Sequence, residues 1–134
     1  MHKGFLKAGA FFGALSVILG AFAAHSIKEK VSPDVLAIFE TGVRYQFYHA
    51  FALLVVGILY DRFPGKTMIW SGRLFSTGIV LFSGSLYLLT GLKASGIKDL
   101  RWAGIITPFG GAAFIAGWIC MMISFYKPAV KDFE

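Results

Sequence analysis

The sequence predicts an all-α integral membrane protein, a four-helix bundle of four transmembrane helices in a single transmembrane domain over 1–134. Two observations carry this prediction. Of the 134 residues, 57% are hydrophobic and only 15% are charged, whereas soluble domains carry about 25% charged residues. The hydrophobic residues also gather in four long runs. A soluble domain of this size could not bury so many apolar side chains, so we expect lipid to cover much of the surface.

Four segments are long and apolar enough to cross a hydrocarbon core about 30 Å thick, which takes about 20 helical residues. They are 5–25, 43–60, 70–92 and 108–126. Thr107 and Pro108 precede and open the fourth span, and proline is favoured at the first helical position because its missing amide hydrogen has no partner there. We therefore expect 93–106 to be an interfacial connector with a basic and aromatic belt. The belt comprises Lys93, Lys98, Asp99, Arg101 and Trp102.

An interfacial helix is expected between spans 1 and 2. The tripeptide Ser32-Pro33-Asp34 combines a capping residue, a proline at the first helical position and an acid in the first turn. A helix from there to Tyr60 would be about 42 Å long at about 1.5 Å per residue, more than the hydrocarbon core requires. The excess predicts an interfacial segment over 33–41 and a bend near Gly42. The apolar side chains expected to face lipid are Val35, Leu36, Ile38 and Phe39.

The cations flank the spans. The net charge of +6 does not indicate nucleic acid, because no basic face with interleaved aromatics exists. An even number of spans places both termini on one side, and the charged loop 61–66 favours a cytoplasmic position for both. Seven cations are counted on that side against six on the other. The seven are Lys3, Lys7, Arg62, Lys66, Arg73, Lys127 and Lys131.

Small residues form a seam along each of two spans. Helical phase places those of the first span opposite its large side chains; they are Gly9, Gly13, Ser16, Gly20 and Ala24. Those of the fourth span are Gly110, Ala113, Gly117, Cys120 and Ser124. Because lipid provides little hydrophobic drive between helices, close backbone approach through small residues provides much of the packing. We interpret these glycines, with Thr107 and Pro108, as structural.

Polar residues in the other two spans also follow helical phase. On the second span they share a stripe of Gly42, Gln46, His49 and Gly57. On the third they share a face of Arg73, Ser76, Thr77, Ser83, Gly84 and Tyr87, opposite Leu74, Ile79, Phe82, Leu86 and Leu89. Since a polar group facing hydrocarbon is costly, we expect the two polar stripes to meet inside the bundle.

Two histidines and one carboxylate–guanidinium pair lie within or beside the first two spans. Glu40 and Arg44 are four apart in the order that favours a helical ion pair. His25 closes the first span and His49 lies about 9 Å beyond the entrance of the second, so the two could approach one another. Ionisable groups inside a membrane are functional candidates, and the alternative is a histidine bonded to a backbone carbonyl. No metal-ligand or haem spacing accompanies them, so we expect no cofactor and no metal.

Several stretches together resemble the small four-span transmembrane protein 256 family, a family of unknown function. They are 20–25, 39–49, 84–89 and 106–111, through Gly117-Trp118. The resemblance covers nearly the whole chain and implies no activity. The residues that carry the family pattern are His25, Glu40, Arg44, Tyr45, Gln46, His49, Thr107 and Pro108. We expect a multi-pass protein of a bacterial cell membrane.

The first functional hypothesis is a non-enzymatic membrane protein whose polar cluster near one membrane face binds a lipid-like ligand or a partner helix. Its candidate ligand-binding residues are His25, Glu40, Arg44, Tyr45, Gln46, Tyr48, His49, Arg73 and Tyr87. Two alternatives stay open: a small transporter or channel component that uses the polar face of the third span, and an intramembrane redox or haem-binding protein. No catalytic motif is present in the sequence. Membrane lipids are the expected partners, with a homo-oligomer or another membrane protein also possible.

Overall fold

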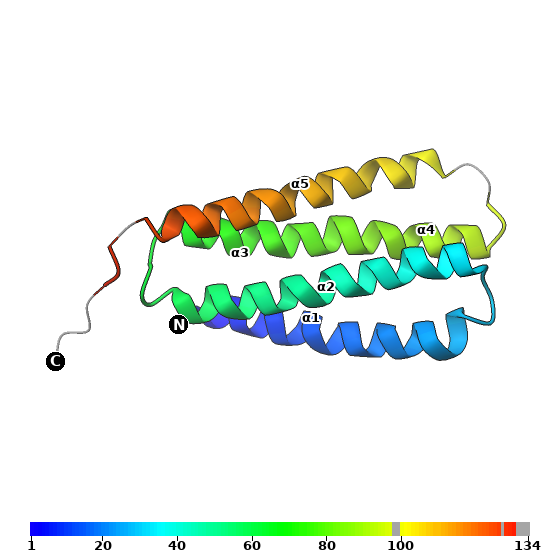
Figure 1. Cartoon of the computed structure of the whole chain (residues 1–134), viewed down its shortest axis with the longest axis horizontal. Helices are drawn as coiled ribbons and strands as arrows, with labels where there is room; N and C mark the ends of the chain where they lie inside the picture. Colours follow the sequence, from blue (N-terminus) through cyan, green and yellow to red (C-terminus); the bar gives the residue numbers. More distant parts are fainter. Residues whose placement is uncertain (98–99, 127, 131–134) are drawn as a thin grey trace.

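The computed structural model describes residues 1–97, 100–126 and 128–130, which form four long antiparallel helical spans (Figure 1). Two of the spans contain a π-helical segment, labelled η1 and η2. In chain order the elements are α1 (Lys3–Phe22), η1 (Ala23–Ile27), α2 (Pro33–Leu59), α3 (Lys66–Gly78), η2 (Ile79–Ser83), α4 (Gly84–Ala94) and α5 (Arg101–Ser124).

Each of the four spans is long and apolar enough to cross a membrane, which confirms the predicted number. The spans alternate in direction, so the N-terminus and the loop from α2 to α3 lie at one end of the molecule (Figure 1). The backbone amide of Val130 donates to the carbonyl of Arg62 at 2.9 Å, which places the segment after α5 at the same end. We call this end the terminal end, and the opposite one, with the loop 28–32, the far end.

The spans do not contact one another equally. α2 packs chiefly on α1 and on the α3–η2–α4 span, and α5 packs chiefly on the α3–η2–α4 span. Side chains also join α2 directly to α5, where the rings of His49 and Phe114 stack. The main apolar core consists of Phe5, Ala52, Leu53, Val56, Met68, Phe75, Ile79, Phe114 and Met121. These residues come from the parts of each helix nearest the terminal end. The far end is therefore held together by fewer apolar contacts.

Glycines mark the closest helix contacts. A side chain on Gly110 would meet the backbone of Phe82, and one on Gly117 would meet the Phe75 ring at 2.7 Å. On α1, a Cβ at Gly9 would lie 2.8 Å from the carbonyl oxygen of Ala50. Gly13 and Gly20, expected in the same seam as Gly9, differ from it. Gly13 has open space around it, and a Cβ at Gly20 would approach only Val43, at 3.7 Å.

The separate interfacial helix expected over 33–41 is not formed, because α2 continues from Pro33 through Gly42 without a break. Gly42 is fixed by tertiary contacts: its carbonyl accepts a hydrogen bond from Ser83 Oγ at 2.7 Å, and the Tyr87 ring packs against it. Phe39 is buried against Tyr87, with ring centroids 4.9 Å apart, so its expected lipid-facing position is wrong. These contacts override the low helix propensity of glycine.

The predicted start of the fourth span is also wrong, since α5 begins at Arg101 and contains Pro108 in its interior. Membrane helices tolerate proline where neighbouring helices and polar side chains compensate for the lost backbone bond. Thr107 does not cap the helix; its hydroxyl pairs with Ser85 Oγ at 2.7 Å. In the expected connector, Lys93 belongs to α4, and Arg101 and Trp102 belong to α5. Lys98, Asp99, Lys127 and Lys131 lie outside the described residues.

The third span departs from its predicted faces both before and after η2. Its inner face is set by close packing, because a Cβ at Gly72 would meet the Phe5 ring and one at Gly78 would meet the Phe114 ring. Ile79 and Leu86, predicted to face lipid, are buried, while Arg73 and Thr77, predicted to face inward, are exposed. In η1, Ala23 is buried in place of the predicted Ala24.

The Gly110 contact gives a stability prediction. We expect Gly110→Ala to lower the free energy of unfolding by about 1–3 kcal/mol, because the added methyl group meets backbone atoms of Phe82 that no rotamer change can move. Gly104→Ala, on the same helix with open space around it, should instead be neutral or stabilising by up to about 1 kcal/mol. Thermal unfolding in detergent compares the two. Equal melting temperatures would show that α5 does not depend on this contact.

Candidate functional site

The candidate residues do not form one cluster; the structure divides them among three environments. Between the packed helices lie Gln46 and His49, which are buried, and Tyr87, which is half-buried. Glu40 and Arg44 line a groove on the outside of the α1–α2 pair. The remaining candidates are exposed to differing degrees over the surface; they are His25, Tyr45, Tyr48 and Arg73. Arg73 lies over the Trp70 ring, 5.6 Å from its centroid.

Gln46 is the centre of a buried polar network. Its Nε2 donates to the carbonyl of Phe12 in α1 at 3.1 Å, and its Oε1 accepts from the hydroxyl of Tyr87 in α4 at 2.9 Å. Ser83 adds a second bond between α2 and the third span through the carbonyl of Gly42. The polar stripes of spans 2 and 3 therefore meet inside the molecule in part, through Ser83 and Tyr87, whereas Arg73 at the start of the third-span stripe is exposed.

His49 is held on three sides. Its Nδ1 lies 2.7 Å from the carbonyl oxygen of Tyr45, and the indole Nε1 of Trp118 donates to its Nε2 at 3.2 Å. The ring also stacks on Phe114, with centroids 3.5 Å apart and an interplanar angle of 7°. An indole only donates and a carbonyl only accepts, so these partners assign a neutral imidazole with its hydrogen on Nδ1.

This arrangement leaves no lone pair of His49 for a metal or haem iron, because Nε2 is already an acceptor. His25 does not approach it. His25 lies exposed in η1 at the far end, whereas His49 is 16 residues into α2, roughly 24 Å along the helix. The expected proximity of the two histidines is thus wrong. Within the described residues, no three His, Cys, Asp or Glu side chains gather closely enough to hold a metal ion.

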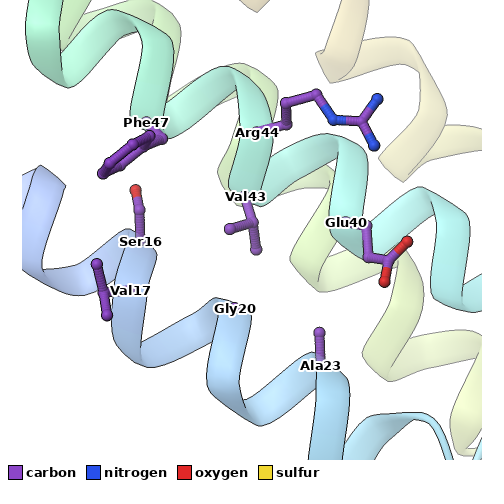
Figure 2. Close-up of a pocket in the computed structure, with 8 residues that line it drawn as sticks. All are labelled: Ser16, Val17, Gly20, Ala23, Glu40, Val43, Arg44 and Phe47. Carbon is purple, nitrogen blue, oxygen red and sulfur yellow. The ribbon is translucent and has the colours of Figure 1, made fainter.

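A groove of about 330 Å³ opens between the later part of α1 and the early part of α2. Figure 2 shows small and apolar side chains on both of its walls. The lining residues are Ser16, Val17, Gly20, Ala23, Glu40, Val43, Arg44 and Phe47. We call it the α1–α2 groove.

The contact between α1 and α2 is tighter near the terminal end than along the groove. Near the terminal end, the amide of His2 donates to the carbonyl of Gly57 at 2.8 Å, and the N-terminal ammonium pairs with Asp61. Further along, Gly9 meets α2 closely and Phe12 accepts the Gln46 bond. Towards the far end the ribbons of α1 and α2 lie further apart in Figure 1, and a Cβ at Gly20 would approach Val43 only to 3.7 Å.

Glu40 and Arg44 line this groove as exposed charges. The ion pair expected between them is not formed, and neither side chain has an ionic partner within the described part of the chain. In Figure 2 both side chains leave α2 at one end of the groove without meeting. The groove thus combines an apolar interior with a negative and a positive group that are both free to bind.

The family model described as "Protein of unknown function (DUF423)" matches residues 19–111, which is more than half of the chain. The chain belongs to the DUF423 family. The matched segment contains the α2 wall of the α1–α2 groove and, from the α1 wall, Gly20 and Ala23. No solved structure matches this protein.

Full-length bacterial relatives support the same conclusion. The chain is 41% identical over 126 residues to the "UPF0382 membrane protein YwdK" of Bacillus subtilis, with 93% of this chain and 98% of the relative covered. It is 40% identical over 128 residues to the "UPF0382 membrane protein SH2409" of Staphylococcus haemolyticus, with 93% and 97% covered. This DUF423 protein is therefore a multi-pass bacterial membrane protein. The matches carry the DUF423 and UPF0382 names rather than the transmembrane protein 256 name.

Sequence reasoning missed several residues of these sites. Val43 and Phe47 follow Glu40 at three and seven residues, so helical spacing could have placed them on its face. No comparable signal links Trp118 or Phe114 to His49, because those contacts join helices far apart in the sequence.

The assignment of His49 gives a second prediction. We expect Trp118→Phe to lower the free energy of unfolding by about 1–2 kcal/mol, because it leaves a buried acceptor without a donor. Trp102→Phe, at an exposed tryptophan of the same helix, should change stability by less than about 0.5 kcal/mol. The ¹⁵N NMR spectrum of the wild-type protein should show the His49 hydrogen on Nδ1. A hydrogen on Nε2, or equal stability of the two variants, would contradict the assignment.

Proposed function

We propose that this DUF423 protein is a non-enzymatic membrane protein that binds one membrane lipid in the α1–α2 groove. An acyl chain lies between the walls formed by Gly20, Val43 and Phe47, and the headgroup contacts Glu40 and Arg44. The observation that carries the proposal is an apolar groove between two spans, lined at one end by two charged side chains that have no ionic partner among the described residues.

The size and lining of the groove support this function. Ligand sites are commonly clefts of about 300–1,000 Å³ with mostly apolar walls and a few polar groups that orient the ligand. The groove has about 330 Å³ and two charged lining residues. It opens on the side of α1 and α2 that faces outward, so a lipid can enter from the bilayer without crossing the protein interior.

The depth of the charges supports a headgroup contact. Counted from Pro33, Glu40 is roughly 10 Å and Arg44 roughly 16 Å along α2. Charged side chains at such depth are costly unless they are paired or reach the interface. A lipid headgroup drawn down to them supplies the missing partners, and the long arginine side chain can extend back towards the surface.

The other two hypotheses receive less support from the geometry. The transport hypothesis depends on polar groups of the third span, yet Ser83 and Tyr87 are bonded to α2 rather than lining the groove. The redox hypothesis depends on His49, whose two ring nitrogens both have partners. Glu40 and Arg44 are the charged residues of α2 that line the groove.

Filling the groove tests the proposal. Gly20→Leu places a side chain inside it, where only Val43 is near. We expect the protein purified in mild detergent to retain a phospholipid, and the variant to retain about tenfold less, equivalent to about 1.4 kcal/mol of binding. Native mass spectrometry measures the bound lipid. Gly13→Leu, also on α1 with open space around it but outside the lining, should retain as much lipid as the wild type.

Two outcomes would overturn the proposal. If Gly20→Leu and Gly13→Leu retain equal amounts of lipid, the groove is not the binding site. If the species lost from Gly20→Leu is a polypeptide rather than a lipid, the groove receives a partner helix. The melting temperatures of both variants establish that each is folded before the comparison is made.

A further inference from the structure

The order of the two groove charges along α2 distinguishes one kind of lipid headgroup from another. α2 starts at the far end, and Glu40 comes before Arg44. The carboxylate is therefore attached nearer the membrane surface, and the guanidinium is attached four residues, or roughly 6 Å, deeper. A ligand that satisfies both must present a positive group towards the surface and a negative group below it.

An aminophospholipid has its charges in this order. Its phosphate is attached to the glycerol next to the acyl chains, and its primary ammonium lies beyond the phosphate, further from the bilayer centre. With an acyl chain in the groove, the phosphate meets Arg44, because guanidinium binds phosphate with paired hydrogen bonds. The ammonium then meets Glu40 and can donate up to three hydrogen bonds to the carboxylate.

We infer that the α1–α2 groove selects a zwitterionic phospholipid with a primary amine, of the phosphatidylethanolamine type. This inference rests on the proposed lipid-binding function. Phosphatidylglycerol offers Arg44 the same phosphate but gives Glu40 no cation, so the carboxylate loses its partner and repels the headgroup. Phosphatidylcholine has a cation without N–H donors, so it cannot donate a conventional N–H hydrogen bond to Glu40.

The charged residues of the groove lining support selection of a zwitterionic headgroup. Glu40 and Arg44 are the two charged residues among those that line the groove. The nearby cations of the far end, Lys28 and Lys30, belong to the loop after η1 and are not in the lining. The headgroup therefore meets one negative and one positive side chain rather than a basic surface, which would favour anionic lipids.

A second copy of the chain could satisfy the same charges, since Glu40 of each copy would meet Arg44 of the other across a two-fold axis. One variant separates this arrangement from lipid selection. Exchanging the residues, Glu40→Arg with Arg44→Glu, keeps the net charge and keeps reciprocal pairing between copies. It reverses the order of charges along the membrane normal, so it removes the match to an aminophospholipid.

The experiment measures how much of each lipid binds to the delipidated full-length protein by native mass spectrometry. The probes are phosphatidylethanolamine, phosphatidylcholine and phosphatidylglycerol with identical acyl chains. We expect the wild type to bind the ethanolamine lipid about tenfold more tightly than the glycerol lipid, which corresponds to about 1.4 kcal/mol. Glu40→Gln should abolish this preference, and so should the exchange variant. Glu29→Gln changes the net charge equally at a residue outside the groove and should keep the preference.

The outcomes separate the two claims. Equal or tighter wild-type binding of the glycerol lipid, or a preference that survives in both Glu40→Gln and the exchange variant, overturns the headgroup inference. If Gly20→Leu still reduces binding of every lipid, the groove remains the lipid site. If Gly20→Leu has no effect on any lipid, the proposed function fails as well. A contact between copies is the alternative role of the two charges. It is indicated if the exchange variant still forms dimers and the wild type shows no headgroup preference.

Discussion

The side chain of Gln46 determines how three of the four spans lie relative to one another. Its amide bonds α1 at the Phe12 carbonyl and α4 at the Tyr87 hydroxyl from a fully buried position on α2. A buried amide that loses either partner incurs a desolvation cost that lipid cannot offset. Both bonds are therefore needed together, and they fix the register of α1 and α4 against α2. The core near the terminal end and the groove near the far end lie on either side of this point.

Helical phase predicted the buried faces of spans 2 and 4 because both are regular α-helices in the structure. Gln46 and His49 are buried, and so are Gly110 and Gly117. The same reasoning chose the wrong face of the third span, where Ile79 and Leu86 are buried and Arg73 is exposed. That span also contains the π-helical turn at Ile79–Ser83. The residue types of that segment do not predict a π-helical turn. Its position instead accompanies the contacts of Ser83 with Gly42 and of Phe82 with Gly110, which belong to the tertiary structure.

The candidate site was predictable in its charges but not in its shape. Glu40 and Arg44 stand out in the sequence as ionisable residues within a span, and helical spacing predicted that they would pair. The groove depends on how closely α1 and α2 approach one another at each point along their length, and no local pattern encodes that distance. For His49, the sequence left open a ligand and a bonded histidine. The partners that decide between them, Tyr45 and Trp118, come from its own helix and from one far along the chain.

The contact between α1 and α2 changes in character along its length. At Gly9 the two backbones meet so closely that a Cβ would lie 2.8 Å from the carbonyl oxygen of Ala50. At Gly20 the nearest atom to a Cβ would be a methyl carbon of Val43 at 3.7 Å, an ordinary packing distance. A larger side chain at Gly9 must therefore push the two helices apart, whereas one at Gly20 enters an existing groove and leaves the core near the terminal end unchanged.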